Sequence, residues 1–216
     1  MSLKRENYEL WWSKNLGKRS YLHDGAEVDA PSLESFGTWM GDSKSRDRVA
    51  VRSHFIDQGT FLDVGCGAAP EYEGLKRSKP GLSYTGVDIT PELVEFNKLR
   101  GIECFEGTAN SLPFESNSYD VVHCRHVVEH MSNVISPLNE FIRVASQKVY
   151  LVFFIGPSIL KSRFKLDNEG TEGEVFHNSY SKSEIKNILK SSEKVAKYKF
   201  IKVPKPSTYL LEIDLK

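Results

Sequence analysis

Short apolar runs, each broken by glycine or an acidic residue, recur through the middle of the chain. The first covers residues 60–64 and ends at Gly65-Cys66-Gly67. An apolar run bounded by glycines predicts a buried strand that stops at a tight turn. Glycines at such a turn allow positive φ and let a ligand approach the backbone, and a helix that starts there offers it N–H groups. The stretch therefore predicts a cradle for a small molecule.

Further runs predict strands and helices that alternate after this turn. We expect strands at residues 82–88, 102–106, 121–124 and 148–155, and helices at residues 71–76, 90–100 and from 136 onward. Ser181-Lys-Ser-Glu184 has the form of a capping box and predicts a helix that runs to Leu189. Two strands, 197–203 and 208–215, follow without a helix between them, which predicts an antiparallel hairpin at a sheet edge. Residues 158–176 show no clear periodicity.

The first 42 residues do not have the pattern of a sheet. The apolar positions that favour a short helix here are Tyr8, Leu10, Trp11, Trp12 and Leu16. Residues 17–42 are rich in loop-forming residues, and their aromatic side chains either form a lid over a ligand site or cover a face of the sheet. Residues 43–55 then predict a helix. Its Lys44, Arg46 and Arg48 are expected in solvent, with contact to a ligand carboxylate as the alternative.

Composition narrows the class of protein. The chain has 216 residues, enough for one α/β domain, and its 29 Lys and Arg balance its 29 Asp and Glu. A net charge of zero argues against strong electrostatic capture of nucleic acid or of an anionic membrane, although a balanced total can still contain a local basic patch. No apolar run approaches the roughly 20 residues of a membrane span. The three cysteines, Cys66, Cys104 and Cys124, form no Cys-x-x-Cys pair. We therefore expect no disulfide framework and no zinc site, and we expect the protein in the reducing cytoplasm.

The residues around the glycine turn separate two classes of cofactor. A dinucleotide site needs Gly-x-Gly-x-x-Gly, but the third glycine is replaced by Pro70. Asp63 would repel a pyrophosphate and would suit a cationic ligand. The sequence Asp63-Val-Gly-Cys-Gly67 resembles the first motif of class I S-adenosylmethionine-dependent methyltransferases. The resemblance extends to Asp88 at the end of the second strand and to Leu112-Pro113-Phe114.

This resemblance implies a Rossmann-like three-layer αβα sandwich, with a seven-stranded, mostly parallel sheet and one antiparallel strand near the C-terminal edge. Residues 43–216 would form the methyltransferase domain, and residues 1–42 a helical and loop-rich cap belonging to it. The cofactor would be S-adenosylmethionine, with S-adenosylhomocysteine as the product. The resemblance is specific from about residue 59 to residue 154, and it thins after Gly156-Pro157.

The resemblance also implies which residues contact the cofactor. Those residues are Asp63, Gly65, Cys66, Gly67, Asp88, Ile89, Thr108, Ala109, Cys124 and Arg125. Asp88 would bind the ribose hydroxyls, with helix capping as the alternative role, although Thr90 is better placed to cap. Ile89, Thr108 and Ala109 would surround the adenine. Thr108 stands where the family commonly has an aspartate, and a hydroxyl accepts a hydrogen bond more weakly than a carboxylate does.

Three histidines are the candidates for a general base: His126, His130 and His177. The transfer mainly requires alignment of the acceptor with the methyl group and exclusion of water, and a hydroxyl acceptor also benefits from a base. His126-Val-Val-Glu-His130 matches the inverted zinc-protease pattern. It follows a strand directly, however, so we expect a structural role for Glu129 and no metal, with a divalent ion at Glu129 and His130 as the alternative.

The acceptor is expected to be an oxygen or nitrogen of a small metabolite, such as a sugar, a lipid-linked or a secondary-metabolite intermediate. Nucleic acid is disfavoured, because no Asp/Asn-Pro-Pro-Tyr/Phe follows the fourth strand and Cys124 lacks a preceding proline. The alternatives are methylation of an RNA or protein, which a basic face would favour, and a non-catalytic regulator that binds the cofactor. The sequence leaves the oligomeric state open.

Overall fold

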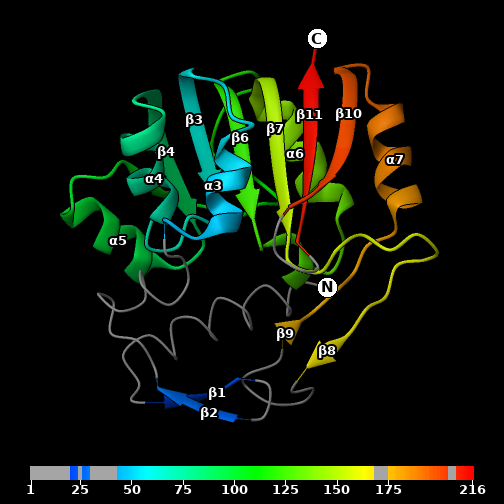
Figure 1. Ribbon diagram of the computed structural model, residues 1–216, viewed down its shortest axis with the longest axis horizontal. Helices are drawn as coiled ribbons and strands as arrows, with labels where there is room; N and C mark the ends of the chain where they lie inside the picture. Colours follow the sequence, from blue (N-terminus) through cyan, green and yellow to red (C-terminus); the bar gives the residue numbers. More distant parts are fainter. Residues whose placement is uncertain (1–19, 24–25, 30–42, 168–174, 204–207) are drawn as a thin grey trace.

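The computed structural model describes residues 20–23, 26–29, 43–167, 175–203 and 208–216. Its centre is a seven-stranded sheet with the order β10-β11-β7-β6-β3-β4-β5 (Figure 1). The strands, in chain order, are β3 (Gln58–Val64), β4 (Gly81–Asp88), β5 (Cys104–Glu106), β6 (Tyr119–Arg125), β7 (Ala145–Phe153), β10 (Val195–Lys202) and β11 (Tyr209–Leu215). β11 is antiparallel to both of its neighbours, and the other pairs are parallel. The expected sheet and its hairpin are confirmed.

Helices cover both faces of this sheet. They are α3 (Arg46–Arg52), α4 (Pro70–Ser78), α5 (Pro91–Leu99), α6 (Ile135–Val144) and α7 (Lys182–Ser191). Successive strand residues point to opposite faces. Phe61 therefore packs in a core with Val51 of α3 and Leu75 of α4, while Leu62 packs with Phe141 of α6 and others. Two cores on either side of one sheet make the three layers.

Local signals mark the starts of three helices, α4, α5 and α7. Pro70 and Pro91 occupy first-turn positions, where the missing N–H costs nothing. The Ser181 hydroxyl accepts a hydrogen bond from the Glu184 N–H at 3.0 Å, as the capping box predicts. α3, in contrast, is shorter than the helix expected at residues 43–55.

Two regions expected to lack strands contain short ones. The backbone at β1 (Ser20–His23) and β2 (Ala26–Asp29) forms an antiparallel hairpin separate from the main sheet. Asp-Gly lies between these runs at residues 24–25, and this dipeptide favours two-residue hairpin connections. β8 (Leu166–Asp167) and β9 (Val175–Phe176) form a second small antiparallel pair. The helix expected around Trp11 lies outside the described residues.

The topology places the site. β3 lies between β4 and β6, so the chain reverses its direction of progress across the sheet at β3. In open α/β sheets, ligands bind at the carboxyl ends of the strands at such a reversal. The described residues contain no helix that is long and apolar enough to span a bilayer.

Candidate functional site

The glycine turn after β3 has a backbone shape that requires glycine. Gly65 and Gly67 have φ values of +73° and +56°, a region that disfavours residues with a Cβ. The N–H groups of Gly65 and Cys66 both donate to the Val87 carbonyl, at 2.8 and 3.0 Å, which ties the turn to β4. A Cβ on Gly65 would lie 2.3 Å from Cγ2 of Val127. The turn is therefore held between β4 and the segment after β6.

This turn forms one wall of a cavity of about 1070 Å³, a volume that includes its open mouth. The cavity lies where the topology predicts it, at the carboxyl ends of β3, β4 and β6. Its lining includes these residues expected from the sequence: Asp63, Gly65, Cys66, Gly67, Asp88, Ile89, Thr108, Ala109, Arg125, His126 and His130. Cys124 and His177 are not part of that lining. Cys124 is fully buried in β6.

Asp88 both lines the cavity and holds the backbone around it. One carboxylate oxygen accepts a hydrogen bond from the Gly67 N–H at 2.8 Å, and the other accepts one from the Thr90 N–H at 3.0 Å. Burial raises the pKa of Asp88, and these two N–H groups oppose that effect. Thr90 occupies the N-cap position of α5, as expected, but its side chain makes no capping hydrogen bond. Asp88 thus holds the glycine turn and the backbone just before α5 in place.

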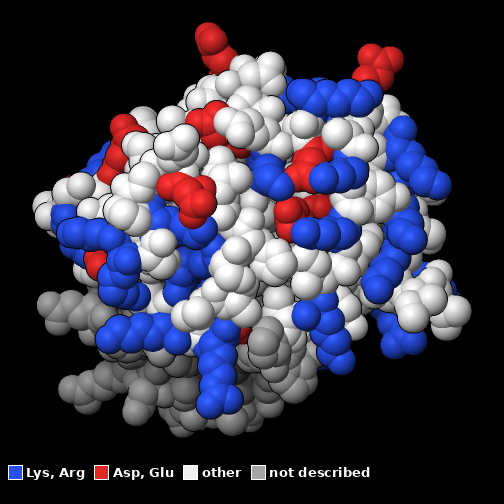
Figure 2. All heavy atoms as spheres, turned by 45° about the horizontal axis from the view of Figure 1, so that its top comes forward, with Lys and Arg blue, Asp and Glu red and all other residues white. Residues whose placement is uncertain are grey.

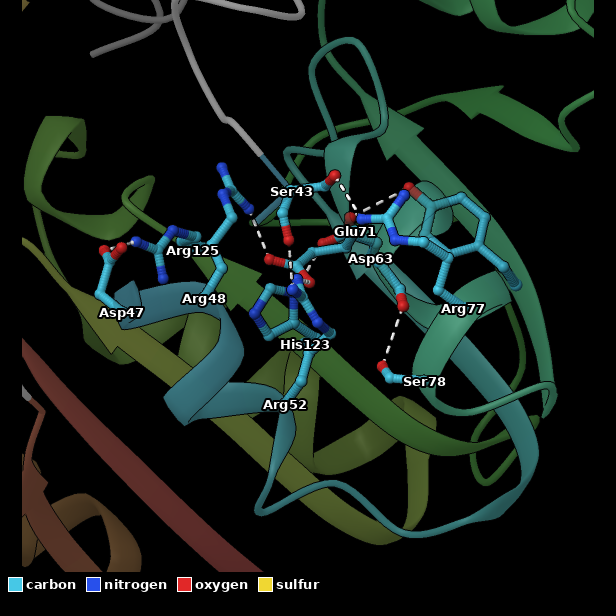
Figure 3. A network of polar contacts seen from close by, with 12 residues as sticks. Ser43, Asp47, Arg48, Arg52, Asp63, Glu71, Arg77, Ser78, His123 and Arg125 are labelled. Carbon is cyan, nitrogen blue, oxygen red and sulfur yellow. Dashed lines mark hydrogen bonds and ion pairs between the residues drawn. The ribbon is translucent and has the colours of Figure 1, made fainter. Parts of the chain in front are cut away.

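The carboxylate of Asp63 belongs to a buried cluster of polar side chains, part of which Figure 3 shows. Its Oδ1 lies 2.7 Å from Nδ1 of His123, and its Oδ2 accepts a hydrogen bond from the Tyr84 hydroxyl at 3.0 Å. His123 is fully buried and lies in β6, next to β3. Sequence reasoning missed His123, because it occupies an ordinary position in an apolar strand.

Glu71 and two arginines of α3 form the second half of the cluster. The Arg48 and Arg52 guanidinium groups donate to the two oxygens of Glu71, at 2.5 and 2.8 Å. Burial alone would raise the pKa of Glu71, but the nearby charges of Arg48, His123 and Arg52 lower it to about 2. Arg48 and Glu71 both line the cavity. The expectation that Arg48 is solvated is wrong, since only 6% of it is exposed.

Arg125 brings a further guanidinium group to the cavity wall. It donates a hydrogen bond to Oδ2 of Asp47 on α3. Arg48 and Arg125 both line the cavity, and Figure 3 shows their side chains near each other. Positive groups at this place suit a ligand that carries a carboxylate.

The three candidate histidines gather around Phe154. The ring centroids of His126, His130 and His177 lie 5.3, 5.2 and 6.0 Å from that of Phe154. Nδ1 of His130 lies 2.8 Å from the carbonyl oxygen of Phe176, and burial lowers the pKa of His130 to about 4. Nδ1 of His177 is hydrogen-bonded to Oδ2 of Asp167, and the His177 ring packs against that of His130, with 5.2 Å between centroids.

Glu129 is a structural residue in this geometry. It lies in a short 3-10 turn, Val128–His130, and is fully buried. Its Oε1 accepts hydrogen bonds from the Phe154 and Ile155 N–H groups, at 2.6 and 3.3 Å. Burial raises its pKa to about 8. A zinc-protease arrangement needs both histidines on one side of a helix, and this turn does not provide that helix.

The residues expected near the adenine also lie in the cavity wall. Thr108 and Ala109 follow β5, and the Thr108 hydroxyl accepts a hydrogen bond from the Asn110 N–H at 3.4 Å. Ile89 adds an apolar side chain to the same lining. Cys66 completes the turn, with its Sγ 3.6 Å from that of Cys104.

Comparison with known proteins agrees with this geometry. The model of the methyltransferase domain family matches residues 62–153. A phthiotriol/phenolphthiotriol dimycocerosates methyltransferase of Mycobacterium ulcerans is 31% identical, covering 70% of this chain and 60% of its own length. A demethylmenaquinone methyltransferase of Thermotoga maritima is 31% identical, covering 55% of this chain and 51% of its own length. The chain thus spans less than two thirds of these relatives.

Solved structures agree on the fold. An S-adenosylmethionine-dependent methyltransferase from Mesorhizobium loti superposes with a TM-score of 0.60 at 12% identity, covering 81% of this chain and all of the other. At that identity the similarity concerns the fold alone. The family match, the sheet order and the glycine turn at its reversal together show that residues 62–153 carry a methyltransferase domain of the class I S-adenosylmethionine-dependent type.

Proposed function

We propose that the protein transfers a methyl group from S-adenosylmethionine to an oxygen or nitrogen of a small metabolite in the cytoplasm. The observation that carries the proposal is the cavity at the reversal of the sheet, which combines the Gly65 turn with the buried Asp88 carboxylate. When bound, the cofactor supplies a methyl group activated by a positive sulfonium. Residues 43–216 would form the catalytic domain, and residues 1–42 a cap belonging to it.

The charges of the lining residues support the choice of this cofactor. Gly65 and Gly67 supply the positive φ values that shape the turn beside the cavity. Asp88 keeps accepting capacity beyond its two N–H partners, because each carboxylate oxygen has a second lone pair. It would bind the ribose hydroxyls, while Thr108 and Ala109 would contact the adenine. Arg48 and Arg125 would face the carboxylate, and Asp63 would balance the positive charge.

His130 is the favoured candidate for a general base, with His126 and His177 beside it. A carbonyl only accepts hydrogen bonds, so Nδ1 of the neutral ring carries the proton toward Phe176 and Nε2 carries the lone pair. A pKa of about 4 keeps this ring neutral at pH 7. The ring is therefore in the form that accepts a proton, although its low pKa makes it a weak base.

The acceptor class that the relatives favour is a lipid-linked or quinone-like small molecule. The names of the two relatives described above point to lipid and quinone substrates. A sugar or a secondary-metabolite intermediate is the other small-molecule class that we consider. Two alternatives to a small-molecule acceptor are a macromolecular acceptor and a regulator that binds the cofactor without transferring its methyl group. The experiment below distinguishes among the three.

The test combines cofactor binding with transfer of label. We expect S-adenosylhomocysteine to bind the wild-type protein in calorimetry, and labelled S-adenosylmethionine to label a solvent-extractable product from cell extracts. Label that precipitates with acid would indicate a protein or RNA acceptor. Binding of the cofactor without any labelled product would indicate a regulator. Absence of binding would reject the assignment of the cavity.

A further inference from the structure

The segment that follows β7 holds apolar side chains out in solvent. Ile159, Leu160 and Phe164 are 82%, 80% and 60% exposed. These three residues lie within six positions of one another. The other large apolar residues that are exposed in the described part of the chain are spread along the sequence: Val49, Leu99, Phe105 and Ile135. Exposed apolar residues that cluster in this way mark interaction surfaces more often than single ones do.

This exposure is built into the backbone. Arg163 and Ser179 exchange two backbone hydrogen bonds, at 2.7 and 2.9 Å. The Ser162 hydroxyl accepts a hydrogen bond from the Ser181 N–H at 2.8 Å and donates one to Glu184 at the start of α7. Hydrogen bonds thus fix residues 158–163 against the start of α7, while their apolar side chains point outward.

Cations alternate with these apolar side chains. Lys161, Arg163 and Lys165 are exposed, and the acidic group nearest in sequence, Asp167, pairs with Lys165 at 2.7 Å and with His177. Residues 158–167 therefore carry three positive charges and one negative charge.

α7 extends this basic surface. Its Lys186 and Lys190 are exposed. In Figure 2, Lys and Arg gather along the right-hand side, where Figure 1 places α7 and β10. The acidic residue that faces the segment from α7 is Glu184, which is hydrogen-bonded to Ser162.

The segment also lies beside the cavity. β7 runs parallel to β6, so the chain leaves both strands at the same edge of the sheet. The Lys165 carbonyl accepts a hydrogen bond from the His177 N–H at 2.8 Å, and His177 packs against His130 of the cavity wall. A surface to which this segment binds would therefore face the same end of the molecule as the cavity.

We propose that residues 159–165 dock the protein on an anionic lipid surface. Ile159, Leu160 and Phe164 enter the boundary between headgroups and acyl chains, and Lys161 and Arg163 bind the lipid phosphates. Apolar tips flanked by cations are the combination that binds a membrane interface, because burial and charge attraction add. The proposal rests on the exposed apolar and basic side chains of residues 159–165, and it does not depend on which molecule accepts the methyl group.

The test is sedimentation of the full chain with vesicles, one set of phosphatidylcholine and one that also contains phosphatidylglycerol. We expect the protein to sediment with the anionic vesicles, to remain mostly in solution with the neutral ones, and to be released by high salt. Ile159→Ser with Leu160→Ser should lower the partition coefficient by more than about tenfold. Lys161→Gln with Arg163→Gln should lower it by at least about tenfold, and only on anionic vesicles.

A matched control is available at the end of α5. Leu99 is 80% exposed, as Leu160 is, and it follows the exposed Lys98. Lys98→Gln with Leu99→Ser removes the same kinds of group elsewhere, so binding should stay at the wild-type level. Protein that stays in solution with both vesicles, as expected for a segment that binds an acidic protein instead, overturns the proposal. So does an equal loss of binding in the control. Methyl transfer is not measured, so the result is separate from the proposed function.

Discussion

Oδ1 of Asp63 lies 2.7 Å from Nδ1 of His123. Asp63 stands two residues before the glycine turn that shapes the cavity. The Tyr84 hydroxyl donates to the other oxygen at 3.0 Å. Both partners come from neighbouring strands, β6 and β4, so the carboxylate is held on two sides. A buried carboxylate is stable only with such partners. The two contacts fix an acidic group in the cavity wall.

Asp63→Asn tests the charge that this arrangement brings to the cavity. S-adenosylmethionine carries a positive sulfonium, and S-adenosylhomocysteine carries a neutral thioether. Loss of the carboxylate should therefore weaken binding of the first more than the second, by a further factor of about five or more, because a nearby charge pair contributes ~1 kcal/mol or more. Calorimetric titration with both ligands measures the ratio.

Tyr84→Phe is the control for that experiment. It removes one hydrogen bond to Asp63 and keeps the carboxylate. The free energy of unfolding should fall by about 1 kcal/mol, while the ratio of the two affinities stays at the wild-type value. Equal weakening of both ligands by Asp63→Asn would contradict an electrostatic role.

Asp88→Ala tests the ribose assignment. The change removes the carboxylate expected to bind the ribose hydroxyls, and also the acceptor for the Gly67 and Thr90 N–H groups. We expect affinity for S-adenosylhomocysteine to fall at least about tenfold, because hydrogen bonds to a charged group contribute ~1.5–3 kcal/mol each. Glu95→Gln, at an exposed acid of the following helix α5, should bind as the wild type does. Wild-type affinity in Asp88→Ala would refute the assignment.

Gly65→Ala and Gly101→Ala separate a clash from backbone strain. Both glycines have φ near +70°, at +73° and +71°. The new Cβ at position 65 would lie 2.3 Å from Val127, whereas at position 101 no atom of the described residues lies within 4 Å of it. Gly101→Ala should cost about 1–2 kcal/mol of unfolding free energy, the cost of strain alone. Gly65→Ala should cost more, and Val127→Ala should recover part of the difference in urea unfolding. Equal costs at the two positions would show that the clash is relieved without loss.

Glu129→Gln tests the buried carboxyl group through pH. The folded pKa is raised to about 8 from an ordinary value of 4.5, so the folded protein binds the proton that the unfolded chain releases between these values. Stability from this group is therefore fully present below about pH 4.5 and is lost as pH rises toward 8.

The amide that Glu129→Gln introduces is uncharged and cannot lose a proton in this pH range. In urea unfolding, the difference in stability between the Glu129→Gln variant and the wild type should move in favour of the variant as pH rises from 5 to 8. The change should be on the order of 4 kcal/mol, since one pKa unit corresponds to about 1.36 kcal/mol. A difference that stays constant with pH would show that Glu129 ionises normally in the folded protein.

The sequence by itself determined the succession of strands and helices that build the main sheet and its two layers of helices, and the place of the glycine turn. The signals that were used are local. Gly65 and Pro91 act through their own backbone conformation, and Ser181 acts through a hydrogen bond to Glu184, three residues along the chain. Such signals can be read without the fold. Apolar runs likewise identified β3, β4, β6 and β7, because burial of a strand follows from its own composition.

Only the tertiary structure decided which charged groups meet at the cavity. Arg48, Glu71 and His123 are 23 and 52 residues apart along the chain, and each has an ordinary sequence context. Folding brings them to one wall, since α3 and α4 pack on the same face of the sheet. Contacts between distant elements decide whether a charged side chain is solvated or paired. The pattern of residues along the chain does not contain those contacts.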